Sequence, residues 1–267
     1  MDFDNFRRLP DRTGKRILRF EFMLVPLVLA AFLLFWDLLV IWQRYPAFFL
    51  PGPARVWERF LLLVNDGTLW SHTLVTLAEV LSGLFIGLTA ALLLGYGLAK
   101  SPLLERILSP YIVASQAVPV VAIAPLLVVW FGFGELSKAL VCALTVFFPA
   151  LVTTIVGLRS VDPDLRSLMR SLQSSRWQMF SMLEVPAALP VLFAGLKVAV
   201  TLAVIGAVVG EFVGADRGLG FLVNLARGIL DTPMLFVALF VLVFIALGLY
   251  TVVTLLEYVV LRWQRVE

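Results

Sequence analysis

Charged residues are scarce in this sequence. Asp, Glu, Lys and Arg make up 15% of the 267 residues, whereas apolar residues make up 61%. A soluble domain carries about a quarter charged and about half apolar residues, so a soluble globule could not bury this much apolar surface. The composition predicts a polytopic membrane protein.

Cysteine and histidine are almost absent. A single cysteine, Cys142, excludes an internal disulfide and any multi-cysteine metal site, and the lone His72 makes no metal cluster. We expect Cys142 to be a small apolar filler within a span. The net charge of +3 is small, and a basic surplus in a membrane protein is typical of cytoplasmic loops rather than of nucleic-acid binding.

A phosphate-binding loop is also missing. The stretches GLFIG and GFGE lack the Gly-Lys-Ser/Thr ending that a P-loop needs to hold phosphates and magnesium. We therefore expect this chain to bind no cofactor and to hydrolyse no ATP itself.

Six apolar stretches are long enough to cross about 30 Å of hydrocarbon, which takes roughly 20 helical residues. They are residues 22–42, 74–98, 108–130, 137–157, 188–210 and 235–260. Pro119 and Pro125 interrupt the third stretch, because proline removes a backbone donor and kinks a helix. We predict an all-α bundle of about six spans, with residues 1–21 and 261–267 as terminal tails.

The distribution of Lys and Arg predicts the orientation. With the N-terminus inside, 14 basic residues fall on the cytoplasmic side and 6 outside, which favours both termini in the cytoplasm. Segment 43–72 is then outside. It is predicted to form a turn and a short interfacial helix, with Trp57 and Trp70 at the headgroups.

A polar interruption at residues 158–187 is predicted to form a cytoplasmic helical hairpin. Asp162 is placed to cap a helix that starts at Pro163. Apolar residues then follow at the spacing of one helix face, namely Leu165, Leu168, Met169 and Leu172. Gln173 to Ser175 break the helix, and residues 176–183 form a second one. The hairpin either lies on lipid or docks into a groove of a cytoplasmic partner.

The hairpin and its surroundings carry a family resemblance. The stretch DPDLRSLMRSLQSSRWQMFSMLEVPAALPVLFAGLKVA resembles the coupling loop of binding-protein-dependent ABC importer permeases. LPGPARVW, AVPVVAIAPLLVVWFGFGELSK and GEFVGADRGLGFLV resemble other segments of that family, in the same order. Together they cover about residues 50–260. The subgroup it resembles imports nitrate, bicarbonate, alkanesulfonates, taurine, and thiamine or flavin precursors.

The resemblance implies a type I ABC importer permease fold, with segment 73–260 as the transmembrane domain. It also implies a bacterial or archaeal inner membrane, and four partners: a dimer of a separate ATPase, an external solute-binding protein, a second permease copy and the lipid bilayer. By resemblance, the residues that would contact the ATPase are Arg166, Leu168, Met169, Arg170, Leu172, Gln173, Arg176 and Trp177.

The hairpin departs from the family pattern. Ser167, Leu168 and Met169 stand where the family has Glu-Ala-Ala, and Gln173 stands where it has Gly. Gly adopts positive φ at little cost. Gln173 must therefore either adopt that conformation at a cost or form a different turn. Glu79 also stands where a basic residue is expected in this subgroup.

Polar groups within the spans are candidates for a translocation path. They are Ser115, Gln116, Pro119, Glu79 and Glu211. Ser115 and Gln116 alternatively form an ordinary interhelical hydrogen bond, Glu79 alternatively reaches the headgroups, and Glu211 alternatively serves a turn or a subunit contact. For Lys197 the favoured interpretation is that it reaches the headgroups.

Gly83 and Gly87, four residues apart, predict close helix packing, either within the chain or at a dimer interface. Three functions remain: an ABC importer permease, a secondary transporter, which would need buried charged relays, and a membrane enzyme, which would need clustered acids or histidines. The importer fits best. Its solute is predicted to be a vitamin-type heterocycle, such as riboflavin or a thiamine pyrimidine precursor. Sulfonates, taurine or nitrate are the alternative.

Overall fold

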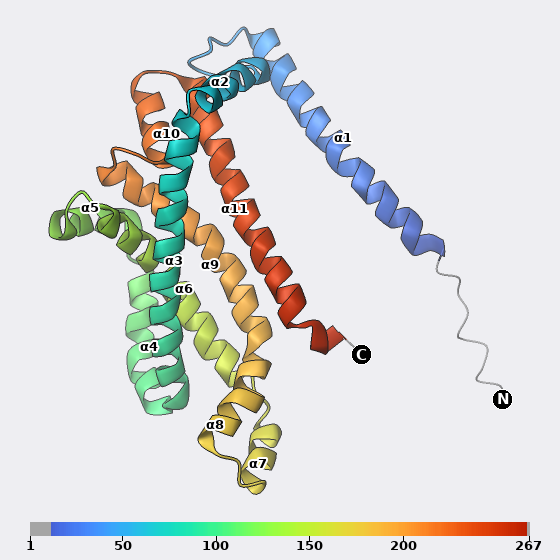
Figure 1. The fold of residues 1–267 in the computed structure, drawn as a ribbon, viewed down its shortest axis with the longest axis vertical. Helices are drawn as coiled ribbons and strands as arrows, with labels where there is room; N and C mark the ends of the chain where they lie inside the picture. The colour runs from blue at the N-terminus through green and yellow to red at the C-terminus, as the bar shows by residue number, and fades with distance from the viewer. Residues whose placement is uncertain (1–11, 266–267) are drawn as a thin grey trace.

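The structure is a computed structural model that describes residues 12–265, and no strand occurs in that range. Figure 1 shows an elongated arrangement of helices. The elements are α1 (Arg12–Gln43), α2 (Pro53–Asn65), α3 (Thr68–Lys100), α4 (Pro102–Gln116), α5 (Val120–Phe131), α6 (Glu135–Arg159), α7 (Pro163–Ser171), α8 (Arg176–Met179), a π-helical turn η2 (Phe180–Glu184), α9 (Val185–Gly214), α10 (Leu219–Gly228), α11 (Thr232–Val260) and a 3₁₀ turn η3 (Arg262–Arg265).

The predicted all-α membrane bundle is confirmed. Five helices within the described residues are long and apolar enough to cross a membrane, and the bent pair α4 and α5 makes a sixth span if counted as one. Helix α1 begins at Arg12, well before the expected start at residue 22. Residues 1–11 of the predicted N-terminal tail lie outside the described residues.

The third span is broken at one of the two prolines that were expected to interrupt it. Pro119 lies at the break, whereas Pro125 lies inside α5 without ending it. Helices α4 and α5 meet at an angle of 92°. Pro119 caps the start of α5 in an extended conformation, with φ −64° and ψ 121°. Because proline has no backbone donor, it suits the first position of a helix better than its interior. The break turns α5 away from the axis of α4 (Figure 1).

Small residues allow α3, α6 and α9 to pack closely. A Cβ added at Gly87 would lie 2.6 Å from the carbonyl oxygen of Ala143, and one added at Gly83 would collide with Cys142. Cys142 is fully buried, and its Sγ lies 3.3 Å from the carbonyl oxygen of Ala203 in α9. Gly83 and Gly87 therefore pack within the chain, and Cys142 is the predicted filler.

The hairpin and the α10 helix lie at opposite ends of the bundle (Figure 1). The sequence predicted a separate second hairpin helix at residues 176–183, and this prediction is wrong. Residues 176–214 form one helical segment of 39 residues. The π-helical turn η2 makes this continuity possible, because Val185 donates its N–H to the carbonyl of Phe180, five residues back. Such a turn realigns the hydrogen bonds next to Pro186, which has no N–H.

Helix α1 stands apart from the bundle along much of its length (Figure 1). Its contact with α11 is aromatic: the rings of Trp36 and Phe236 stack with centroids 5.3 Å apart. The short helix predicted within residues 43–72 is present as α2, and it is held to the start of α11 by an ion pair of 2.6 Å between Arg59 and Asp231. The α10 end of the molecule is thus crossed by α2.

Candidate functional site

The hairpin is built by local capping. Asp162 accepts a hydrogen bond of 2.8 Å from the N–H of Asp164 at the start of α7, as predicted. At the start of α8, Ser175 and Gln178 satisfy each other's backbone N–H groups in a capping box. Gln173 joins the two helices with φ +53°. The glutamine therefore adopts the left-handed conformation, which is the first of the two outcomes expected from the sequence.

All eight residues predicted to contact an ATPase lie on this hairpin, but they differ in exposure. Leu168, Leu172 and Trp177 expose 54%, 69% and 71% of their surface. Arg170 and Arg176 are exposed, whereas Met169 is half-buried. A ridge of large apolar side chains, flanked by arginines, is therefore exposed at one end of the molecule. Exposed apolar patches of this kind are typical of surfaces that contact a partner or a membrane.

Arg166 differs from the other hairpin arginines. Its guanidinium donates a hydrogen bond of 2.7 Å to the carbonyl of Leu158, at the end of α6. Such a carbonyl has no partner within its own helix. Arg166 therefore joins α7 to α6, whereas the sequence predicted that it would pair with a partner protein.

The base of the hairpin is attached to α3 by an ion pair. Lys100 Nζ lies 2.5 Å and 2.6 Å from the two carboxylate oxygens of Glu184. The Glu184 side chain is 5% exposed and that of Lys100 is 43% exposed. Beside the pair, the rings of Tyr96 and Phe180 meet edge to face at 5.2 Å. The π-helical turn is thereby fixed to the end of α3.

Two of the three predicted path residues of the third span, Ser115 and Gln116, lie at a small hollow beside the helix break, whereas Pro119 does not line it. Ser115, Gln116, Thr145 and Phe148 line it, and its volume is about 160 Å³. The Ser115 hydroxyl donates to the carbonyl of Tyr111 in its own helix, at 2.7 Å. Gln116 is exposed. The hollow thus combines an amide, hydroxyl groups and an aromatic ring.

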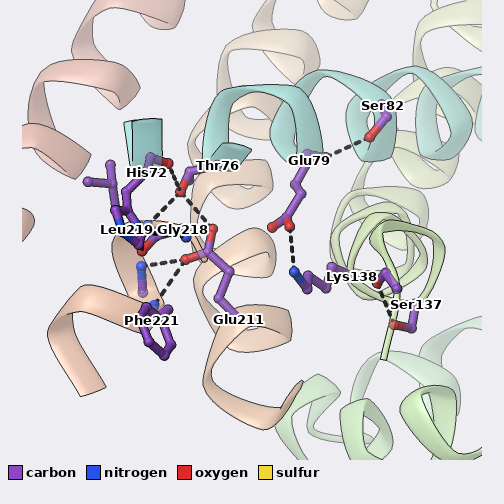
Figure 2. Close-up of polar contacts among 12 residues, drawn as sticks. His72, Thr76, Glu79, Ser82, Ser137, Lys138, Glu211, Gly218, Leu219 and Phe221 are labelled. Atoms are coloured by element: carbon purple, nitrogen blue, oxygen red, sulfur yellow. Dashed lines mark hydrogen bonds and ion pairs between the residues drawn. The ribbon is translucent and has the colours of Figure 1, made fainter. Parts of the chain in front are cut away.

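Glu79 and Glu211 lie in a buried polar region between α3, α6 and α9 (Figure 2). Glu79 pairs with Lys138 of α6 at 3.1 Å, and their side chains are 2% and 5% exposed. Glu79 therefore does not reach the headgroups. Lys138 was one of the six basic residues counted as lying outside the membrane. In the structure it is buried between the packed helices. Pairing is what allows both charges to be buried.

Glu211 binds the start of α10. Its Oε2 accepts hydrogen bonds from the N–H groups of Gly220 and of Phe221, the latter at 3.3 Å. Its Oε1 accepts the hydroxyl of Thr76 in α3 at 2.6 Å. The Thr76 oxygen in turn accepts the N–H of Leu219 at 2.8 Å. Figure 2 shows these groups converging on one turn of backbone.

His72 completes the arrangement. Its Nδ1 accepts the N–H of Gly218 at 2.9 Å, and its ring stacks on Phe221 with centroids 5.8 Å apart. We call His72, Thr76, Glu211 and the backbone of residues 218–221 the outer polar cluster. Within residues 12–265, no three His, Cys, Asp or Glu side chains converge as metal ligands.

The fold and the hairpin agree with comparisons to known proteins. Residues 83–266 match the family described as binding-protein-dependent transport system inner membrane component. The chain belongs to this family. Its members are transport permease subunits of ABC importers and not enzymes.

Three relatives illustrate the range of solutes. The permease is 47% identical over 240 residues to the riboflavin transport system permease protein RibX of Chloroflexus aurantiacus, which covers 90% of each chain. It is 34% identical to the formylaminopyrimidine transport permease protein ThiX of Halalkalibacterium halodurans, over 87% of this chain and 95% of that one. It is 33% identical to the taurine transport system permease protein TauC of Escherichia coli, over 82% of this chain and 81% of that one.

A solved structure shares the fold of this permease. It is the MetNI methionine ABC transporter, with a TM-score of 0.64 and 19% identity over 72% of this chain and 96% of that chain. The expected importer permease fold is confirmed.

Sequence reasoning missed several residues of the permease. The partners Thr76 and Lys138 were not predicted, and Lys197 was expected to reach the headgroups. Instead, Lys197 Nζ lies 2.5 Å from Glu257 Oε2, which joins α9 to α11. Glu257 lies in the last expected span and was the signal for this pair. The motif Gly218-Leu219-Gly220 was the signal for the outer polar cluster, because a Cβ at either glycine would overlap the Glu211 carboxylate.

Proposed function

We propose that this permease forms the membrane path of an ATP-driven importer for a vitamin-type heterocycle, riboflavin or a thiamine pyrimidine precursor. An external binding protein delivers the solute, and a separate ATPase dimer supplies the energy. The observation that carries the proposal is the hairpin: an exposed apolar ridge flanked by Arg170 and Arg176 at one end of the bundle. A groove on a cytoplasmic partner is the kind of surface that covers such a ridge.

In this proposal the hairpin transmits ATP-driven closure as a rigid body. Leu168, Leu172 and Trp177 enter the ATPase groove, and Arg170 and Arg176 pair with acidic groups at its rim. Because α8, η2 and α9 are one helical segment, a displacement of the hairpin acts directly on a membrane-spanning helix. Arg166 then holds α7 to α6 rather than meeting the ATPase.

The proposed arrangement in the membrane places the hairpin and both termini in the cytoplasm. Helix α2 and the α10 end then face the binding protein. A second permease copy completes the path about a two-fold axis, with Ser115, Gln116 and Pro119 at its wall. Glu79 and Glu211 are buried in this conformation. They could line the path only in a different conformation of the permease.

Two features support the choice of solute. The relatives RibX and ThiX are named for riboflavin and formylaminopyrimidine. The hollow at the helix break offers an amide, hydroxyls and the Phe148 ring, which could contact one edge of a flat heterocycle. Its volume of about 160 Å³ is below that of a whole ligand pocket, so in this proposal the second permease copy supplies the rest of the site. The relative TauC is named for taurine, which makes a sulfonate-type anion the alternative solute.

The solute is tested by ATP-dependent uptake into proteoliposomes that contain the permease with its ATPase and its binding protein. Labelled riboflavin, hydroxymethylpyrimidine, taurine and nitrate are compared. Accumulation of riboflavin or the pyrimidine, only with ATP, supports the proposal. Accumulation of taurine or nitrate instead identifies the anion alternative, and uptake that ignores ATP rejects the importer.

The docking role is tested with the double variant Leu168→Glu/Met169→Glu. We expect it to reach the membrane but to lose ATP-dependent uptake and co-purification with the ATPase, because two charges enter an apolar contact. Ser171→Glu is the control, since it adds one negative charge to an exposed position of the same helix outside the apolar ridge. Uptake that survives the double variant shows that the hairpin merely lies on lipid.

A further inference from the structure

The start of α10 has a complete set of external hydrogen-bond partners. The first N–H groups of a helix have no acceptor within it. Here the N–H groups of Gly218, Leu219, Gly220 and Phe221 are bound by His72, Thr76 and Glu211. None of these acceptors belongs to α10. Two come from α3 and one from α9.

The burial of these acceptors makes the contact costly to break. Thr76 is 0% exposed and Glu211 1%. A buried carboxyl group that loses its hydrogen-bond partners costs free energy, so the Glu211 oxygens depend on the donors around them. If α10 moved away, Glu211 would lose two N–H donors, and one donor would remain from Thr76. Rigid movement of α10 with α3 and α9 keeps all of these bonds.

The same two helices are joined again at the other end of the molecule. Lys100, the last residue of α3, binds Glu184 at the start of the α9 segment. Thus α3 and α9 are tied by polar contacts both at the hairpin and at α10. The segment that carries Glu211 begins at Arg176, within the hairpin itself.

We propose that Glu211 is a positioning residue, with Thr76 as its link to α3, that makes α10 move as one body with α3 and α9. This inference rests on the proposed function, in which the binding protein meets the α10 end and the ATPase meets the hairpin. Arrival of the loaded binding protein at α10 is then transmitted along α9 to the hairpin. Without the outer polar cluster, α10 shifts alone and the ATPase receives no signal.

The test measures ATP hydrolysis by the reconstituted importer, with and without solute-loaded binding protein. Thr76→Val keeps the shape of the side chain but removes the hydroxyl. We expect stimulation by the binding protein to fall by about tenfold, the order expected when a hydrogen bond to a charged group is lost, while unstimulated hydrolysis and assembly with the ATPase are retained. Thr76→Ser should restore stimulation.

Thr154→Val is the matched control. Thr154 is also buried, but its hydroxyl donates to the carbonyl of Ala150 in its own helix. Full stimulation in Thr76→Val overturns the inference, and so does an equal loss of stimulation in Thr154→Val. A purely structural role of Thr76 would lower assembly with the ATPase and leave the stimulation ratio unchanged. If Thr76→Val does not assemble, Thr76→Ala removes the same hydroxyl, and unchanged stimulation there rejects the inference.

The failure of the proposed function gives a different result. In that case the wild-type importer shows neither ATP-dependent uptake nor stimulation by a binding protein, and the inference falls with it. A wild type that transports, together with a Thr76→Val variant that keeps its stimulation, rejects only the inference.

Discussion

Gln173 shows how one residue can take over a glycine's place at a tight turn. Its φ of +53° lies in the left-handed region, where a side chain is disfavoured. The turn is held on both sides, because Gln173 donates its N–H to Arg170 and Ser174 donates to Met169. These bonds offset the local cost, so the hairpin keeps its shape without the family glycine.

A substitution series at position 173 tests this account. We expect Gln173→Gly to change stability by less than about 1 kcal/mol and to leave transport in place, since glycine suits the conformation but loosens the unfolded chain. Gln173→Val should cost about 1–3 kcal/mol, because a β-branched residue resists positive φ. Thermal unfolding and uptake are measured together; equal stability of all three proteins would contradict a left-handed turn.

At the scale of helices, the contact between α3 and α6 depends on glycines that face the partner helix. We expect Gly87→Ala to cost about 1–3 kcal/mol, because its methyl group would press on the Ala143 carbonyl. Gly97, in the same helix, has nothing within 4 Å of an added Cβ, so Gly97→Ala is the control. Melting temperatures of the purified permease decide between them, and equal losses would mean that both act through backbone flexibility.

The ion pair between α9 and α11 provides a second test at this scale. The side chains of Lys197 and Glu257 are 20% and 19% exposed. Lys197→Met leaves a largely buried carboxylate unpaired and should cost about 3 kcal/mol, whereas Lys197→Met/Glu257→Gln should recover most of this loss. A double-mutant cycle on thermal stability measures the coupling. No recovery in the double variant would show that the lysine acts by packing alone.

For the whole molecule, the membrane orientation is the main prediction. Cys142 is buried, so a charged thiol reagent does not reach it. A cysteine introduced at the surface is then the site that the reagent labels. We expect Ser171→Cys to react only after the cytoplasmic side is exposed, and Asp66→Cys to react in intact cells. The reverse pattern would invert the proposed topology and remove the hairpin from the reach of any ATPase.

Much of this architecture could be predicted from the sequence, because span length, proline breaks and helix capping are local properties. The break of the third span at Pro119, the Asp162 cap and the presence of a short helix at α2 are as predicted. The pairing of Lys138 with Glu79 and of Lys197 with Glu257 could not be, since it depends on which helices become neighbours. The π-helical turn could not be predicted either, because the sequence indicated a hairpin helix at residues 176–183 and a separate span from residue 188. The structure instead joins the two in one segment beside the Lys100–Glu184 ion pair.

The continuous segment from the hairpin to Gly214 has a consequence for reach. Its 39 residues span about 58 Å at the usual helical rise, nearly twice the roughly 30 Å of a hydrocarbon core. In the proposed orientation, with Gly214 placed at the opposite surface, an upright helix of this length would extend past the lipid headgroups. Trp177 would then lie in the aqueous phase, where a small tilt of the helix within the bilayer becomes a large sideways displacement.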